Sequence, residues 1–298
     1  MATRFEIVLH GDDPVRLRAA GEEAVREIER LDAQLSMYRP DSGISQINRL
    51  AAREPVKVEP RLFGLLQHCS ELTESTEGAF DIAVAPLMRI WGFTGDSGRI
   101  PDAAEIEAAL EVTGMRHVHF DEDSFNVCFD CEGVMLDLGA IGKGYAVEKA
   151  AEILREDGVT SALIHGGTST VFGIGAQPDG KPWKIAVRHP TQPDAYIEVV
   201  ELCDSALSVS APGGKSFVER CVQFGHVIDP RSGQPVQGAL TAVVTGGSPT
   251  DCDALSTALL VLGESGLPLL AERFPGYSGA VAVSSADGVT VKRTADRR

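Results

Sequence analysis

The stretch around which this sequence is organised is Gly133-Val-Met-Leu-Asp137-Leu-Gly139-Ala140-Ile-Gly142-Lys143-Gly144-Tyr145-Ala-Val-Glu-Lys149. Its apolar start predicts a short strand over 134–136, and the residues after the glycines have helical spacing through about residue 156. A glycine-rich turn lets the backbone approach a ligand closely, and the N-terminus of a following helix favours anions. Asp137 stands at the predicted strand end and Lys143 enters the helix. The stretch therefore indicates a site for a phosphate-bearing cofactor.

Length and charge narrow the class of protein. The chain has 298 residues, 43% of them hydrophobic, which suits a soluble globular protein with a large core. Its net charge of −16 argues against nucleic acid or an anionic membrane as the main partner. No apolar run approaches the roughly 20 residues that span a bilayer, and the N-terminal residues lack a secretory pattern. We therefore expect no nucleic-acid partner, no membrane insertion, and a cytoplasmic location, or an exported one if a leader was removed.

The six cysteines are scattered, and Cys128 and Cys131 form the only close pair. No second pair completes a zinc motif, and this pair falls in an alternating stretch, so we interpret it as part of a strand or turn. We expect free thiols, which is consistent with a reducing compartment.

Helical and strand patterns alternate along the rest of the chain, separated by Gly and Pro turns. A long helix is predicted from residue 14, with Val15, Ala19, Ala24, Ile28 and Leu31 on one face. Further helices are predicted over 42–49, 60–77, 101–110, 251–262 and 267–274. Strands are predicted over 5–9, 116–120, 126–129, 160–165, 171–175, 183–188, 196–202, 207–210, 223–229, 240–245, 279–284 and 289–291. We predict an α+β fold, a single compact domain over residues 1–298 with mixed or antiparallel sheets and flanking helices.

Asp81 lies in an almost uncharged segment that runs from residue 79 to residue 93. An unpaired buried carboxylate is costly, so this side chain needs a partner. It either caps the turn before Pro86 or hydrogen-bonds a ligand, and both interpretations remain open.

A second candidate group is Asp253-Ala-Leu-Ser256-Thr257, in a predicted helix with Thr250 or Asp251 as its N-cap. Asp253 and Thr257 are four residues apart and therefore share one helix face. Their oxygens are the kind of ligand that Mg²⁺ prefers. The alternative is structural, because an acid in a first turn stabilises the helix dipole and a threonine can bond back to its own helix.

His226, three residues before Asp229, is the third candidate. It lies in a predicted strand that leads into a Pro/Gly turn, where a histidine is often only a structural hydrogen bonder. Its titration range makes it the best proton acceptor in the chain if it faces the site. His165, before Gly166 and Gly167, is a weaker candidate.

Several motifs, collinear over nearly the whole chain, resemble the FAD:protein FMN transferase (ApbE) family. They are Met1-Ala-Thr, Leu35-Ser-Met-Tyr38-Arg-Pro-Asp-Ser42, Gly78-Ala-Phe-Asp81, Trp91-Gly92-Phe93, the opening stretch from Leu136 to Val147, His226-Val-Ile-Asp-Pro-Arg-Ser-Gly233, and Asp253-Ala-Leu-Ser-Thr257. The resemblance implies an enzyme that binds FAD with a divalent cation, usually Mg²⁺, on its pyrophosphate. It would move FMN to a Thr or Ser hydroxyl of a flavoprotein acceptor and release AMP. The alternatives are an FAD pyrophosphatase giving FMN and AMP, and a non-catalytic flavin-binding protein.

The resemblance also implies roles for single residues. His226 and Asp253 would be catalytic. The metal ligands would be Ala140 through its backbone carbonyl, Asp253 and Thr257, with Ser256 nearby. The FAD contacts would be Met1, Tyr38, Ala79, Phe80, Asp81, Asp137, Lys143 and Ile228. The chain departs from the family pattern at Thr168, where an Asp usually follows two glycines, and at Ser208-Val209-Ser210-Ala211-Pro212, in place of a Thr/Ser-Ser-Gly segment.

Overall fold

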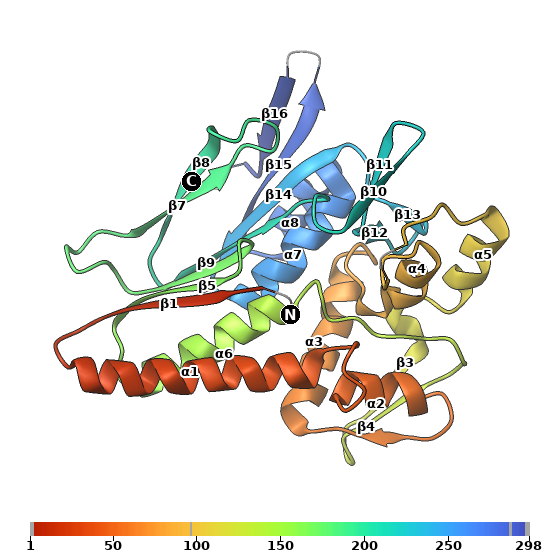
Figure 1. The fold of residues 1–298 in the computed structure, drawn as a ribbon, viewed down its shortest axis with the longest axis horizontal. Coiled ribbons are helices and arrows are strands. Elements are labelled where there is room, and N and C mark those ends of the chain that lie inside the picture. Colours follow the sequence, from red (N-terminus) through yellow and green to blue (C-terminus); the bar gives the residue numbers. More distant parts are fainter. Residues whose placement is uncertain (1–2, 96, 286–287, 296–298) are drawn as a thin grey trace. The chain divides into compact units, whose positions relative to one another are not determined.

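The computed structural model describes residues 3–95, 97–285 and 288–295 (Figure 1). The chain forms two compact units. Unit 1 comprises Met1–Asp32, Ile141–Ala211 and Gly238–Arg298, and unit 2 comprises Ala33–Ala140 and Pro212–Gln237. The α+β class with antiparallel sheets is confirmed, since helices accompany sheets in which every pairing among the described strands is antiparallel. The single domain over 1–298 stays a prediction.

Unit 1 is built on a seven-stranded sheet in the order β1-β5-β6-β9-β14-β15-β16. These strands are β1 (Phe5–His10), β5 (Ser161–Gly166), β6 (Thr170–Ile174), β9 (Ser205–Ser210), β14 (Ala239–Gly246), β15 (Ser278–Ser285) and β16 (Gly288–Arg293). A separate hairpin joins β7 (Trp183–Arg188) to β8 (Tyr196–Leu202). The strand predictions in this unit are confirmed to within one or two residues at most ends.

The two faces of this sheet carry different partners. Val171, Leu207 and Val243 form a buried cluster with Trp183 and Leu202 of the hairpin. Because side chains alternate along a strand, the residues next to them point to the opposite face. That face packs on α6 (Gly142–Glu156) and α7 (Pro249–Leu262), which Figure 1 shows side by side. The strand ends on the helical face carry the hydroxyl groups discussed below.

The long helix α1 (Pro14–Leu35) buries Ala24, Ile28 and Leu31 as predicted, but at its N-terminal end Ala20 is buried instead of Val15 and Ala19. Its buried side chains are Ala20, Ala24, Ile28, Leu31 and Leu35. Val15 is 77% exposed. Helical spacing of three to five residues allows either Ala19 or Ala20 to precede Ala24 on the apolar face. The structure buries Ala20.

Helix α7 begins earlier than predicted, and its cap is neither Thr250 nor Asp251. Ser248 is the N-cap: its Oγ accepts from the backbone N–H of Asp251 at 3.1 Å, and Pro249 occupies the first helical position. The helix ends at Gly263 (φ +62°), as predicted.

The segment Pro249–Arg273 is long and apolar enough to span a membrane by length and composition, which corrects the statement that no run approaches that length. It consists of α7, the 3₁₀ turn η3 (Gly263–Ser265) and α8 (Gly266–Arg273). Half of its most apolar window is buried inside the protein, and core helices of soluble proteins pass the same test of length and composition.

Unit 2 holds short helices and three small sheets. Its helical elements are α2 (Gly43–Leu50), α3 (Pro60–Ser75), η1 (Ile82–Val84), α4 (Ala85–Ile90), α5 (Ala103–Glu111) and η2 (Met115–His117). The sheets are β2-β4-β3 (Val56–Lys57, Asn126–Phe129, Val118–Asp121), β10-β11 (Ser216–Glu219, Val222–Gly225) and β12-β13 (Ile228–Asp229, Gln234–Pro235). Trp91 anchors one core cluster, and its indole N–H donates to the carbonyl of Gly233 at 2.8 Å.

Two predictions in unit 2 are wrong. Residues 134–136 form no strand, because the side-chain amide of Asn48 bonds the backbone N–H of Leu136 at 2.7 Å and its carbonyl at 2.9 Å. The amide thus replaces a neighbouring strand. The predicted strand over 223–229 is two strands, since β11 pairs with β10 and β12 pairs with β13, and His226 lies between them. Helix α4 and the short strands β2, β10 and β13 were not predicted.

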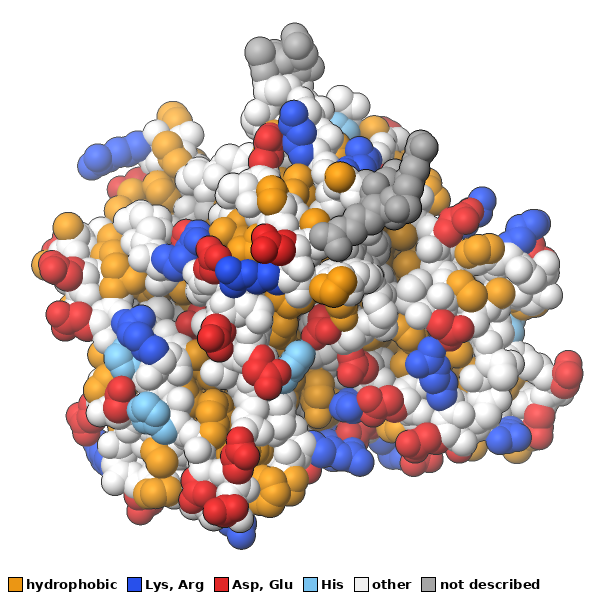
Figure 2. Space-filling view, turned by 180° about the vertical axis from the view of Figure 1, so that it is seen from behind, with side chains coloured by type: hydrophobic (Ala, Val, Ile, Leu, Met, Phe, Trp, Pro, Cys, Tyr) orange, Lys and Arg blue, Asp and Glu red, His pale blue; other side chains and the backbone are white. Residues whose placement is uncertain are grey.

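Charged side chains are distributed over the surface without a large basic area on the face drawn in Figure 2, where acidic groups lie among lysines and arginines. Several form exposed ion pairs, such as Arg99 with Glu105 at 2.6 Å. Solvent screens exposed pairs of this kind, so they are a minor source of stability.

Candidate functional site

Asp253 of α7 is the centre of a buried polar cluster in unit 1. Its side chain is 3% exposed. One carboxylate oxygen, Oδ2, accepts from the backbone N–H of Gly144 at 2.9 Å. The other, Oδ1, accepts from Thr170 Oγ1 at 3.2 Å and from Ser208 Oγ at 3.4 Å, and it lies 3.4 Å from the ammonium of Lys143. A buried carboxylate is stable only with such partners, and this one has four.

Hydroxyl groups extend this cluster along α7 and β9. Ser210 Oγ lies 2.8 Å from Ser256 Oγ and 3.2 Å from Thr257 Oγ1. Ser256 Oγ in turn lies 3.3 Å from Ser208 Oγ. Asp253, Ser256 and Thr257 therefore share one oxygen-lined face, as the spacing of Asp253 and Thr257 predicts. The segment 208–212, which departs from the family pattern, contributes the hydroxyls of Ser208 and Ser210 to this cluster.

The structural alternative for these residues is present in part. Thr257 Oγ1 donates back to the carbonyl of Asp253 at 3.3 Å, as the alternative supposes. Asp253 itself is the fifth residue of α7, and its carboxylate bonds the first turn of α6 rather than that of its own helix. The helix-dipole explanation therefore applies to the neighbouring helix α6.

Close packing of α6 on α7 depends on Gly144. A Cβ at this position would overlap the carbonyl oxygen of Pro249 and would lie 2.7 Å from the Cβ of Asp253. Such contacts are not tolerated, so only glycine lets the two backbones approach this closely. The glycine-rich stretch thus brings the N-terminus of α6 to an acidic side chain of α7.

The start of α7 is held by a second set of bonds. Ser248 Oγ donates to Glu148 Oε2 of α6 at 2.6 Å. Glu148 Oε2 also accepts from the backbone N–H of Thr250 at 3.3 Å. Tyr277 donates to Asp251 Oδ2 at 2.6 Å. Burial and the bond to Asp251 raise the pKa of Tyr277. These bonds fix the first turn of α7 and hence the position of Asp253.

In unit 2, Asp137 organises the turn that contains the proposed carbonyl ligand. Its Oδ1 accepts from the backbone N–H of Gly139 at 2.8 Å, and its own N–H donates to the carbonyl of Ile82 at 2.7 Å. This side-chain-to-backbone bond is an Asx turn, which fixes the local backbone. The turn includes Ala140, whose carbonyl the resemblance assigns to the metal.

Tyr38 lies near both a base and an acid within unit 2. The ammonium of Lys215 lies 5.8 Å from the centre of its ring, in a cation–π contact. Burial, and then the charge of Asp137, raise the pKa of the Tyr38 hydroxyl. Tyr38 is nevertheless 57% exposed, so its ring is accessible to a ligand.

Asp81 caps η1, which confirms the capping interpretation. Its Oδ1 accepts from the N–H of Ala83 at 2.7 Å, and its Oδ2 accepts from the N–H of Met115 at 3.0 Å. Burial raises its pKa despite these bonds. Ala79, Phe80 and Ile228 are almost fully buried, with exposed fractions of 1%, 1% and 4%. Their roles as FAD contacts stay predictions, and Met1 lies outside the described residues.

His226 lies between β11 and β12, and its ring packs on the backbone of Gly214. A Cβ at Gly214 would lie 2.6 Å from the ring carbon Cε1. The backbone N–H of His226 donates to the carbonyl of Lys215 at 3.0 Å. His165, the weaker candidate, lies on the opposite face of the large sheet from Thr170, since it pairs directly with Val171. It therefore does not reach the Asp253 cluster.

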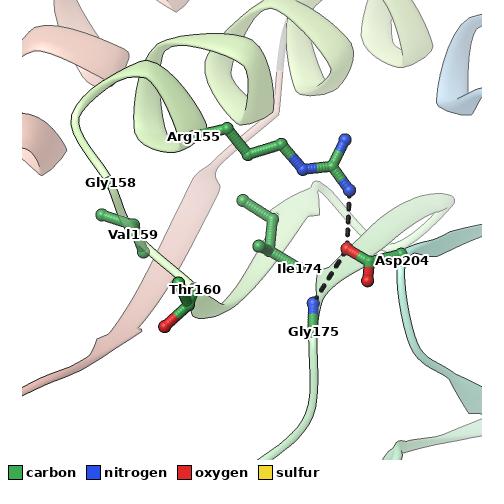
Figure 3. A pocket seen from close by; sticks show the side chains of 7 residues that line it. All are labelled: Arg155, Gly158, Val159, Thr160, Ile174, Gly175 and Asp204. Carbon is green, nitrogen blue, oxygen red and sulfur yellow. Dashed lines mark hydrogen bonds and ion pairs between the residues drawn. The ribbon is translucent and has the colours of Figure 1, made fainter.

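A shallow hollow of about 300 Å³ in unit 1 contains none of the predicted site residues (Figure 3). In it, Arg155 Nη2 donates to Asp204 Oδ1 at 2.6 Å, and the same oxygen accepts from Gly175 N–H at 3.1 Å. The guanidinium also lies 5.2 Å from the centre of the Phe172 ring. The guanidinium of Arg155 therefore links the end of α6 to Asp204.

Comparison with known proteins places the chain in a family. The ApbE family model matches residues 1–281, and the chain belongs to this family. The resemblance seen in the sequence is confirmed. A relative from Klebsiella pneumoniae, named FAD:protein FMN transferase, is 34% identical over 83% of this chain and 77% of its own. A relative of the same name from Vibrio cholerae is 31% identical over 81% of this chain and 73% of its own.

Solved structures agree with these relatives. The ApbE protein from Thermotoga maritima superposes with a TM-score of 0.88 at 30% identity, over 98% of this chain and 94% of that one. The flavinyl transferase ApbE from Pseudomonas stutzeri, in its apo form, gives 0.85 at 32% identity, over 97% and 90%. The fold predicted from the resemblance is therefore confirmed.

The hydroxyl residues Thr170, Ser208 and Ser210 of the Asp253 cluster were not predicted as site residues. Thr170 and Ser208 are direct partners across β6 and β9, so both hydroxyls reach Asp253 from one place on the sheet. A sequence signal existed in the alternation of Ser208 and Ser210, which puts both on one strand face. Thr168, the first departure, is exposed in the turn between β5 and β6.

Proposed function

We propose that this protein transfers FMN from FAD to a Thr or Ser hydroxyl of a flavoprotein acceptor and releases AMP. Membership of the ApbE family and two relatives named FAD:protein FMN transferase support an enzyme of this type. The observation that carries the proposal in this chain is the buried Asp253 carboxylate, surrounded by hydroxyls and by Lys143. The use of Mg²⁺ and the identity of the acceptor residue as Thr or Ser both belong to this proposal.

The donor set of the Asp253 cluster fits Mg²⁺. Its possible ligands are a carboxylate and hydroxyls, all hard oxygen groups, and the described residues add no sulfur or imidazole to it. The Lys143 ammonium, 3.4 Å from Asp253 Oδ1, is a counter-charge and not a ligand. Asp253 and Thr257 would hold the ion, and Ser256 lies beside them. When bound, the ion supplies charge neutralisation at the pyrophosphate of FAD.

In the transfer, the acceptor oxygen forms a bond to the phosphorus of the FMN half. The bond from that phosphorus to the bridging oxygen breaks, and AMP leaves with the bonding electrons. The acceptor hydroxyl is a poor nucleophile and must lose its proton, for which His226 is the proposed base. Phosphoryl-type transfer depends mainly on positioning and charge neutralisation, which suits a preformed cluster of this kind.

The deciding experiment is incubation of the purified protein with FAD, Mg²⁺ and a candidate acceptor flavoprotein. Covalent flavin on the acceptor, detected by mass spectrometry and in-gel fluorescence, supports transfer. The matched control is the same acceptor with its target hydroxyl residue changed to alanine, which must stay unlabelled. Free FMN and AMP without labelling would establish hydrolysis instead. Intact bound FAD would establish a flavin-binding protein.

A further inference from the structure

A separate group of nitrogen, oxygen and sulfur donors lies in unit 2 beside the β3–β4 pair. His117 precedes β3, while Asp130 and Cys131 follow β4. The N–H of Asp130 donates to the carbonyl of His117 at 3.1 Å, which extends the β3–β4 ladder by one residue pair. Ligand atoms of His117, Asp130 and Cys131 all lie within 4.8 Å of one another. The fold therefore brings together three side chains that commonly bind transition metals.

The distances suit a small tetrahedral ion. His117 Nδ1 lies 3.8 Å from Cys131 Sγ and 2.8 Å from Asp130 Oδ1. Ligands about 2.0–2.3 Å from a tetrahedral zinc ion stand roughly 3.3–3.8 Å from one another. The first pair already has this spacing. The second is a hydrogen bond that must lengthen by roughly 0.5 Å to reach it, a change within the reach of side-chain rotation.

His119 is the candidate for a fourth ligand. His119 lies on β3 directly opposite Cys128 of β4. Since Val118 and Val127 point into the core, these two side chains point to the other face of the sheet. His119 Nε2 lies 3.6 Å from Asp130 Oδ2. The His119 imidazole thus lies next to the carboxylate, and its side chain must turn toward the other three ligands to complete the coordination.

We propose that His117, His119, Asp130 and Cys131 bind one Zn²⁺ ion as a structural site. Thiolate and imidazole ligands favour zinc and similar borderline metals over Mg²⁺, which prefers oxygen. Four protein ligands leave no open position, so the ion holds the start of β3 to the end of β4 and takes no part in transfer. Binding of the ion releases the thiol proton of Cys131 to solvent, because the thiolate is the form that coordinates a metal.

The test uses full-length, metal-free protein without a polyhistidine tag, titrated with Co²⁺ in excess Mg²⁺. Magnesium occupies oxygen sites such as the Asp253 cluster, so the near-ultraviolet thiolate-to-cobalt absorption reports only a cysteine-containing site. We expect this absorption to saturate at one equivalent and to disappear on addition of Zn²⁺. It is expected to be lost in Cys131→Ser and kept in Cys203→Ser, a matched change of an exposed thiol in unit 1.

Thermal unfolding gives a second measurement. Zn²⁺ should raise the melting temperature of the wild type and of Cys203→Ser but not that of Cys131→Ser, because an ion that binds only the folded state stabilises it. If Cys131→Ser fails to fold by circular dichroism, Asp130→Asn takes its place. Absence of the absorption in the wild type, or its persistence unchanged in Cys131→Ser or Asp130→Asn, would overturn the proposal.

Discussion

Asp253 in unit 1 and Asp81 in unit 2 are both buried carboxylates, but they are stabilised by different kinds of donor. Asp81 accepts from two backbone N–H groups, those of Ala83 and Met115. Asp253 accepts from one backbone N–H and from the side chains of Thr170 and Ser208, and it forms an ion pair with Lys143. Asp137 resembles Asp81, since it bonds the backbone of its own turn.

The two kinds of donor differ in whether a cation can replace them on the carboxylate. A hydroxyl or an ammonium can rotate away and let a cation take its place on the carboxylate. A backbone N–H cannot leave without unfolding the turn that it belongs to. Asp253 is therefore suited to bind an ion reversibly, whereas Asp81 and Asp137 are suited to hold backbone in a fixed position. The following predictions test this contrast.

The largest effect is expected for Asp253→Ala. Loss of the carboxylate should lower FMN transfer roughly a thousandfold or more. Removal of one partner from a buried ion pair should also cost about 3–5 kcal/mol of stability. The measurements are transfer rate at limiting Mg²⁺ and denaturant unfolding. Asp179→Ala is the matched control, because Asp179 pairs with Lys181 at 2.9 Å on the surface. Unchanged activity of Asp253→Ala would refute the assignment.

His226→Ala should slow transfer by about a hundredfold or more while FAD affinity stays close to the wild-type value, since a general base acts on the acceptor proton. Single-turnover labelling and FAD titration measure the two quantities separately. His68→Ala, a change on the surface of α3, should alter neither. Weaker FAD binding with a normal rate for the bound fraction would make His226 a structural residue.

Gly144→Ala should destabilise the protein by about 1–3 kcal/mol, because the new methyl group forces α6 and α7 apart. Transfer should fall as well, since Asp253 moves with α7. The control is Gly64→Ala in α3, where a Cβ meets nothing within 4 Å. Alanine is favoured over glycine in a helix, so this control should gain up to about 1 kcal/mol. Equal effects at both positions would contradict the close-packing argument.

The smallest effect on transfer is expected for Asp81→Ala. This change leaves two buried N–H groups without their acceptor and should cost about 1–3 kcal/mol of stability. The rate of the folded fraction should fall far less than in Asp253→Ala. Chemical denaturation and labelling of the same samples give both values. A loss of transfer as large as that of Asp253→Ala, with unchanged stability, would reverse the roles of the two acids.

Much of the fold follows from the sequence because strong local patterns coincide with the final elements. β4, β7 and β8 were predicted to the residue, and α6 nearly so. The failures have a common cause in long-range partners. Residues 134–136 have the pattern of a strand, but the amide of Asn48, far away in the sequence, bonds Leu136 instead. Nothing local to either segment predicts this bond.

The residues of the candidate site likewise divide into those that local sequence patterns predict and those that they do not. The spacing of Asp253 and Thr257 was sufficient to place them on one face, Ser256 was added by the resemblance, and Lys143 was singled out by its position at a helix start. Thr170 and Ser208 were missed because hydroxyl residues in strands are common, and only the pairing of β6 with β9 brings these two to Asp253. Which of several polar strand residues meets a given helix is decided by register.

The Lys143–Asp253 contact also bears on how the protein matures. A buried carboxylate with no cation nearby would oppose folding until an ion arrived, as in small domains that stay unfolded without metal. Here the ammonium of the chain itself supplies the counter-charge at 3.4 Å. Unit 1 can therefore complete its folding in a cell compartment poor in free divalent ions, and chelators should arrest turnover without denaturing the enzyme.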